Sequence, residues 1–167
     1  MIKFILPLML LSSCEAISIK TKPFVAPDSI VYAKKYVGLQ ETNDKAFLQS
    51  RLDVNPSTTE WCAAFVNTIL KEQNIPGSES VSDNPLMARS FLAWGTRVKR
   101  ADIKRGDVVI FSRGSSGWQG HVGFYVGSAK IDGVEQWLII GGNQDDSVSY
   151  ALYSTSTVID IRRAEEK

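Results

Sequence analysis

The hydrophobic pattern of this chain changes its period once, close to residue 106, and that change limits the folds open to it. Before this point apolar residues recur at helical spacing, as Ile30, Ala33 and Val37 do. After it, short apolar runs are separated by turn residues, and Asp132-Gly133 is a strong hairpin signal between two of them. Helices followed by antiparallel strands predict an α+β fold, with N-terminal helices packed on a C-terminal antiparallel sheet.

The same patterns give approximate bounds for the elements. We expect helices over residues 28–38, 44–52, 62–73 and 84–95, the last one beginning at an Asn84-Pro85 cap. We expect strands over residues 106–111, 121–127, 135–141, 148–153 and 158–161.

The N-terminal segment resembles an export signal. A basic start at Lys3 is followed by a short apolar run, too short to span a bilayer. Leu11-Ser12-Ser13-Cys14 resembles the lipobox of bacterial lipoproteins, which implies lipidation of Cys14. Ordinary cleavage after Cys14-Glu15-Ala16 is the alternative, and both predict an exported protein. The chain therefore divides into a signal and lipobox (1–16), a tether (17–27) and one folded domain (28–165).

Composition excludes several kinds of partner. A formal net charge of +1 argues against nucleic acid or an anionic membrane surface as the main partner. One histidine and one available cysteine supply too few ligands for a metal site. We expect a monomer without a metal or other cofactor.

Cys62 and His121 are the candidate catalytic residues. Cys62 is expected in the first turn of a helix, after hydroxyl residues at 57–59 that can cap it, and the helix dipole there favours a thiolate. His121 is the only histidine and follows a glycine-rich loop at the start of a strand. Glycine alternates with His121 along that strand, at Gly123 and Gly127, so we expect the cysteine helix to pack closely on this face. A thiol nucleophile needs such a base. The alternative for Cys62 is a small buried residue of a helix face.

A third polar group should fix the tautomer of His121, and hairpin register decides which group lies opposite it. A two-residue loop at Asp132-Gly133 places Gln144 there, whereas a three-residue loop or one bulge places Asn143 there. Both are amides that can accept the imidazole proton.

Four motifs in order resemble the NlpC/P60 and CHAP group of papain-like cysteine hydrolases, most closely the branch with a long glycine-tryptophan loop before the histidine. They are Trp61-Cys62-Ala63-Ala64-Phe65-Val66, Gly106-Asp107-Val108-Val109-Ile110-Phe111, Gly117-Trp118-Gln119-Gly120-His121-Val122-Gly123-Phe124-Tyr125-Val126-Gly127 and Gly141-Gly142-Asn143-Gln144.

The resemblance implies a permuted papain-like fold and cleavage of amide bonds in peptidoglycan, within the stem peptide or between the stem and the sugar. By the same resemblance, Cys62 is the nucleophile, His121 the base and Asn143 the residue that orients the base. The backbone N–H of Cys62 would contribute to the oxyanion hole. A binding protein of the same fold that docks on peptidoglycan or a partner without turnover is the alternative function.

Overall fold

The computed structural model describes residues 28–165, and it confirms the α+β prediction. The predicted signal, the lipobox at Cys14 and the tether lie outside the described residues. The elements, in chain order, are α1 (Ser29–Ala33), η1 (Lys34–Tyr36), α2 (Lys45–Leu52), α3 (Cys62–Lys71), η2 (Ser78–Ser80), η3 (Ala88–Ala93), β1 (Thr96–Arg97), η4 (Arg100–Asp102), β2 (Val108–Ser112), β3 (Gly120–Ile131), β4 (Val134–Gln144), β5 (Ser147–Ser154), η5 (Thr155–Thr157) and β6 (Val158–Arg163). The helix expected over 84–95 is wrong, because that segment forms only turns and the short 3-10 helix η3.

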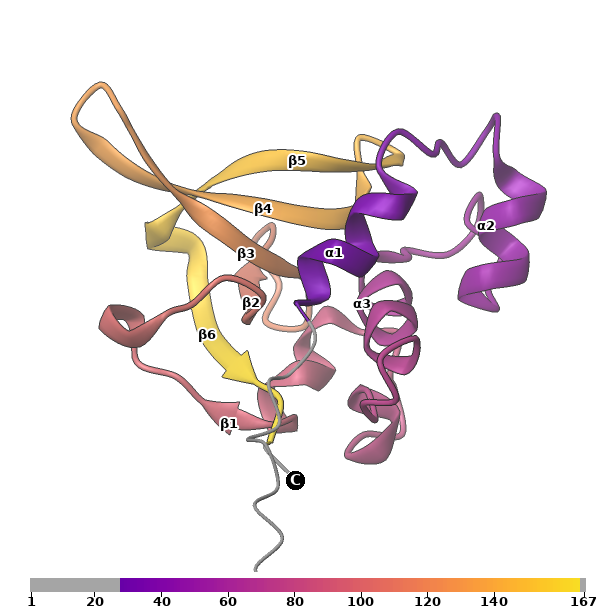
Figure 1. Ribbon diagram of the computed structural model, residues 1–167, viewed down its shortest axis with the longest axis horizontal. Coiled ribbons are helices and arrows are strands. Elements are labelled where there is room, and N and C mark those ends of the chain that lie inside the picture. Colours follow the sequence, from indigo (N-terminus) through magenta and orange to yellow (C-terminus); the bar gives the residue numbers. More distant parts are fainter. Residues whose placement is uncertain (1–27, 166–167) are drawn as a thin grey trace, which may run out of the picture.

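The sheet is antiparallel and its strands lie in the order β1-β6-β2-β3-β4-β5. Figure 1 shows α1, α2 and α3 on one side of this twisted sheet. The β3–β4 hairpin starts with Ile131 opposite Val134, so its loop is Asp132-Gly133 as predicted. Both loop residues have positive φ, 51° and 80°, which is the geometry that an Asp-Gly hairpin favours.

The helix α3 packs against β3 and β4 and forms the main core with them. One side of the sheet supplies Val122, Phe124 and Ile140 to this core. The closest approach is at Gly142, where a Cβ atom would lie 2.5 Å from Trp61 Cζ3 and 2.6 Å from Phe65 Cβ. Only glycine leaves room for the helix at this point, which places the N-terminal end of α3 on the last residues of β4.

A second buried cluster fills the other side of the sheet, with members from β2, β4 and β6: Val109, Phe111, Trp137, Ile139 and Ile161. His121 pairs with Phe111 across the β2–β3 ladder, so its side chain lies on this side. The expectation that the glycine-containing face of β3 receives α3 is therefore wrong. A Cβ on Gly123 would instead lie 2.9 Å from Ile140 O, in the neighbouring strand β4.

Two buried polar links lie near the ends of the described chain. Ser29 Oγ donates to Gln73 Oε1 over 3.3 Å, which joins α1 to the residues just beyond the C-terminal end of α3. At the other end, Arg163 of β6 forms a bidentate ion pair with Asp107, whose Oδ2 also accepts a 2.7 Å bond from the backbone N–H of Lys104. Asp107 thus stabilises the turn that precedes β2.

Candidate active site

Cys62 is the first residue of α3 and is 3% exposed. No side chain caps the helix, because Trp61 occupies the N-cap position and its indole Nε1–H donates to Glu41 Oε2 over 3.1 Å. The backbone N–H groups of Val122 and Ala63 bond to the Cys62 sulfur. Since Val122 directly follows His121 in β3, this bond brings the thiol to the start of the strand that carries the histidine.

Burial raises the pKa of the Cys62 thiol above its ordinary value of 9.0, although the two backbone bonds act in the opposite direction. The charge of nearby Glu60 also raises it, and that of Arg113 lowers it. The expected thiolate is therefore wrong for the free protein: removing the sulfur from water outweighs the stabilisation at the helix N-terminus. Cys62 rests as a neutral thiol at neutral pH.

His121 is 2% exposed, and its ring contacts the side chains of Gln144 in β4 and Tyr153 in β5. Its Nε2 lies 3.2 Å from Gln144 Oε1, and its ring stacks on Tyr153 with centroids 5.1 Å apart and planes at 9°. Burial lowers the pKa of His121 from 6.5 to about 4, the bond to Gln144 raises it in part, and the charge of Arg113 lowers it. The imidazole is thus neutral at neutral pH.

Gln144 determines which nitrogen of His121 carries the proton. Its Nε2 donates to the backbone oxygen of Ser149 over 2.6 Å and approaches Ser149 Oγ at 3.2 Å, so Oε1 is the atom that faces the ring. An oxygen acceptor requires His121 to donate from Nε2–H, which leaves the lone pair of a neutral ring on Nδ1. His121 Nδ1 is buried and has no hydrogen-bond partner in the described part of the chain. The histidine is therefore in the form that can accept a proton.

Asn143, the residue preferred for this position, is not the hydrogen-bond partner of His121; its Nδ2 donates to Glu60 Oε2 over 2.9 Å. A bulge at Val126 does shift the β3–β4 register by one residue, as the Asn143 alternative requires. A second irregularity, between Gly141 and Gln144, adds a residue to β4, and Asn143 adopts a φ of 56° there. The two shifts cancel, so the assignment of Asn143 as the partner of His121 is wrong and Gln144 takes its place.

A pocket of about 260 Å³ opens beside Cys62. One wall comes from the turn before η3, with the exposed side chains of Leu86 and Met87. The other comes from the glycine-rich loop, in which Trp118 is 65% exposed. The remaining lining residues are Glu60, Ala88, Arg113, Gln119 and Gly120. The thiol is thus reached from a groove with apolar walls and a charged rim.

No family model and no curated protein matches the chain. Among solved structures it is similar to an NlpC/P60 family protein from Bacillus cereus, described at 1.79 Å resolution, with a TM-score of 0.53 and 19% identity. The chain has an NlpC/P60-like fold. The match covers 86% of this chain and 41% of the Bacillus cereus protein, so the chain spans less than half the length of that protein.

Within this NlpC/P60-like fold, three further side chains belong to the site but were not predicted from sequence. Tyr153 covers the ring of His121, and burial raises the pKa of its own phenol to about 12. Glu60 and Arg113 stand at the rim of the pocket, joined by an ion pair of 3.4 Å. Of these three residues, only Glu60 could have been suspected from the sequence, because it lies two residues before Cys62.

Residues 28–165 contain neither a cluster of metal ligands nor a membrane-spanning helix. No group of three or more histidine, cysteine, aspartate or glutamate side chains there is arranged to hold a metal ion. No helix in that range is long and apolar enough to cross a membrane.

Proposed function

We propose that this protein is an exported cysteine hydrolase that cleaves amide bonds of peptidoglycan, either within the stem peptide or between the stem and N-acetylmuramic acid. Cys62 is the nucleophile, His121 the base, and Gln144 orients the base. The observation that carries the proposal is the hydrogen bond from His121 to Gln144, which leaves Nδ1 unpaired. The Cys62 thiol lies near this histidine, because it is close to Val122, the next residue in β3, and to Tyr153, whose ring stacks on that of His121. The NlpC/P60-like fold supports the substrate class.

The site begins the reaction as a neutral pair. As the Cys62 sulfur attacks the amide carbonyl carbon, its proton passes to His121 Nδ1, and the ring becomes an imidazolium held by Gln144. The carbonyl oxygen gains the negative charge, which the backbone N–H of Cys62 at the end of α3 stabilises. The C–N bond then breaks, the amine leaves with the proton from Nδ1, and a thioester remains. Water, deprotonated by His121, attacks the thioester and releases the acid and the thiol.

Burial of the two side chains helps this reaction, although it disfavours a charged thiolate and a charged imidazolium in the free protein. A buried imidazole with a low pKa stays unprotonated in mildly acidic surroundings, so the base remains available there. The cost is that thiolate and imidazolium must form together as the substrate excludes water. An enzyme of this kind should show little thiol reactivity without substrate.

Incubation of the purified protein with purified peptidoglycan, followed by mass analysis of the soluble fragments, tests the proposal. We expect wild type to release fragments whose masses identify the bond, and Cys62→Ala to release none. Absence of release by wild type, or equal release by Cys62→Ala, would show that the proposed hydrolysis is wrong. A sedimentation assay with the same material separates the alternative, a silent binding protein, which would be retained by peptidoglycan without releasing anything.

We also propose that the mature protein is attached to a membrane through a lipid on Cys14. The support is the Leu11-Ser12-Ser13-Cys14 sequence. Fractionation of cells that express wild type or Cys14→Ser tests it. We expect wild type in the membrane fraction and the variant elsewhere; a variant that stays with the membrane contradicts lipidation at this residue.

A further inference from the structure

The net charge of +1 conceals an uneven distribution of charge along the chain. Residues 96–105, which include β1 and η4, contain five of the 19 lysines and arginines but only one carboxylate, that of Asp102. We call this segment the basic strap. Its five cationic residues are all exposed: Arg97, Lys99, Arg100, Lys104 and Arg105.

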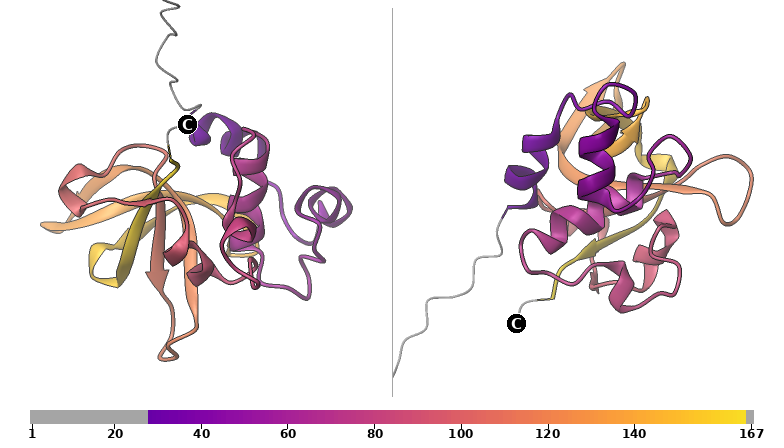
Figure 2. Two further views of the ribbon diagram at one scale, coloured as in Figure 1. Left: turned by 90° about the horizontal axis from the view of Figure 1, so that it is seen from below. Right: turned by 90° about the vertical axis from the view of Figure 1, so that its right-hand side faces the viewer.

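Apolar side chains attach the basic strap to the sheet. Val98 and Ile103 pack against the second buried cluster, and the backbone N–H of Val98 donates to Ile161 O of β6 over 2.9 Å. Figure 2 shows the strap and α3 on opposite sides of the sheet. Because the apolar residues of the strap face the sheet, its cations remain in solvent, on the side of the molecule away from α3.

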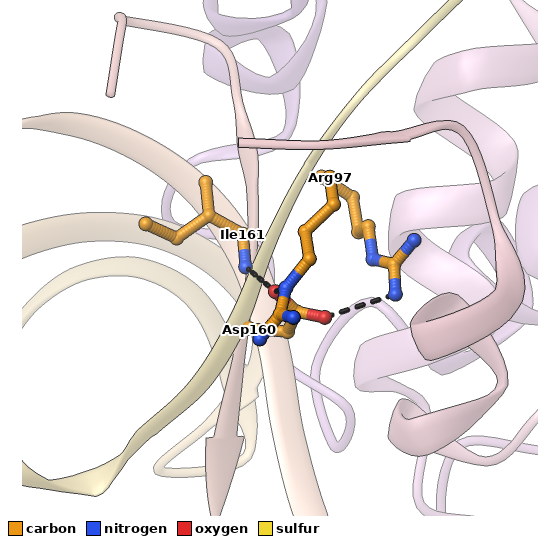
Figure 3. Close-up of polar contacts among 4 residues, drawn as sticks. Arg97, Asp160 and Ile161 are labelled. Atoms are coloured by element: carbon orange, nitrogen blue, oxygen red, sulfur yellow. Dashed lines mark hydrogen bonds and ion pairs between the residues drawn. The ribbon is translucent and has the colours of Figure 1, made fainter. Parts of the chain in front are cut away.

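A pocket of about 520 Å³ lies between the strap and β6, and its one carboxylate is neutralised. Asp160 Oδ1 accepts from Arg97 Nε and from the Ile161 N–H, each over 2.9 Å (Figure 3). Asp160 Oδ2 accepts from Arg162 Nη2 over 2.9 Å, and the Asp160 side chain is only 9% exposed. Two guanidinium groups therefore balance one buried carboxylate, and the pocket keeps an excess of positive charge.

Other cations of the strap can receive a ligand. The side chains of Lys99 and Lys104 have no ion-pair or hydrogen-bond partner within residues 28–165. Arg100 lies over the ring of Trp137, with Cζ 5.5 Å from the centroid, and its Nη2 donates to Thr155 O over 2.9 Å. These contacts hold the guanidinium in place and leave its other N–H groups available. Phosphate oxygens are the acceptors that such a group binds best.

The described chain begins beside the strap. Asp28 Oδ2 accepts from Arg105 Nε over 2.9 Å, and a Cβ on Gly106 would lie 3.7 Å from Asp28 Oδ1. The predicted tether and Cys14 precede Asp28, and residues 17–27 can span at most about 40 Å. A lipid on Cys14 would therefore keep the strap close to a bilayer, where anionic headgroups attract exposed lysine and arginine.

We propose that the basic strap binds the phosphate headgroups of an anionic membrane and thereby orients the protein on it. Because the strap and α3 lie on opposite sides of the sheet, a membrane against the strap leaves Cys62, the first residue of α3, directed away from the lipid. The orientation presents the active site to the cell wall. The proposal uses the proposed lipid anchor to bring the strap to the membrane, and it is independent of hydrolysis.

Vesicle flotation tests the proposal without the lipid anchor. Full chain that carries Cys14→Ser is mixed with vesicles of phosphatidylcholine, alone or with phosphatidylglycerol. We expect tighter binding to the anionic vesicles, weakened by added salt. Adding Lys99→Gln and Lys104→Gln together should weaken binding to the anionic vesicles about twentyfold, at about fivefold for each charge, and leave the neutral vesicles unaffected. Asp102→Asn should instead strengthen it about fivefold.

The matched control removes two lysines elsewhere. Lys45 begins α2 and Lys130 lies near the tip of the β3–β4 hairpin, and both are exposed. Lys45→Gln with Lys130→Gln lowers the net charge by the same amount but does not touch the strap, so binding to the anionic vesicles should be retained. Residues 1–27 are the same in every sample, so they do not contribute to the differences. Circular dichroism checks that each variant is folded.

Three results would overturn the proposal. Equal binding of the two kinds of vesicle would show that the strap does not attract anionic lipid. An equal loss in the strap variant and in the control would show that only net charge matters. Binding of soluble poly(glycerol phosphate) without binding of the anionic vesicles would assign the strap to a phosphate polymer and not to a membrane. Failure of hydrolysis or of lipidation appears separately, in the peptidoglycan and fractionation experiments.

Discussion

Lowering the pH should destabilise this protein, because its only histidine must then be protonated. The burial of the ring determines the size of the effect. In the folded chain the pKa of His121 is about 4, against an ordinary value of 6.5. Between these values the unfolded chain binds a proton that the folded chain does not, so the free energy of unfolding increases with pH there. At about 1.4 kcal/mol per unit of pKa, the contribution is about 3 kcal/mol. It is fully present above pH 6.5 and lost as the pH falls to about 4.

Urea unfolding at pH 7.5, 6.5, 5.5 and 4.5 measures this loss. Carboxyl groups titrate in the same range, so wild type is compared with His121→Gln, which has no ionisable group at this position. The variant should be less stable at neutral pH, because it breaks the packing against Tyr153. Its stability should nevertheless decline less as the pH is lowered, and the difference between the two proteins should shrink by about 2.5 kcal/mol between pH 7.5 and 4.5.

Parallel pH profiles for the two proteins would refute the reasoning. A second measurement reports the pKa of His121 directly, without contributions from other titrating groups. The chain has one histidine, so its ring gives one titrating signal in the NMR spectrum of an untagged sample. A midpoint near 6.5 in the folded protein would show that the ring is hydrated and that burial does not lower its pKa.

Three further outcomes follow from the same contacts. Gly142→Ala places a Cβ 2.5 Å from Trp61 Cζ3 and should cost about 1–3 kcal/mol, measured by urea unfolding; an unchanged midpoint contradicts the close packing. Tyr153→Leu should raise the pKa of His121 towards 6.5 by admitting water, whereas Tyr153→Phe should leave it near 4; NMR titration decides, and equal shifts in both variants argue against ring cover. Alkylation of Cys62 by iodoacetamide should be slow at pH 7 and still rise with pH beyond 9, and a plateau below pH 8 would contradict a raised pKa.

The order of the fold was predictable because it depends on local pattern. Helical spacing before residue 106 and the Asp132-Gly133 turn after it were enough to give the helical layer, the antiparallel sheet and the main hairpin. The helix expected after Asn84-Pro85 failed because its apolar residues pack as a 3-10 turn against β2 and β3. The predicted cap at Asn84-Pro85 is also wrong, because η3 begins at Ala88 and Met87 occupies its N-cap position.

The details of the site depended on quantities that the sequence does not contain. The protonation of Cys62 depends on burial, and the partial charge of one helix end cannot offset the removal of a thiolate from water. The partner of His121 depends on two one-residue shifts that cancel, of which the sequence analysis considered only the first. One signal was present in hindsight: asparagine tolerates positive φ better than glutamine, which favours Asn143 as the bulge residue and Gln144 as the amide that points inward.

The hydrogen bond between Ser29 and Gln73 also determines where a pulling force on the N-terminal end of the described chain would act. Cys62 begins α3 and Gln73 lies just beyond its last residue, so the described chain enters one helix length, about 15 Å, away from the thiol. Tension applied through the residues before Asp28 would be transmitted to the far end of α3 and to a buried serine–glutamine pair. The Cys62 end of the helix, which packs on Gly142 through Trp61 and Phe65, would be the last part of α3 to bear this force.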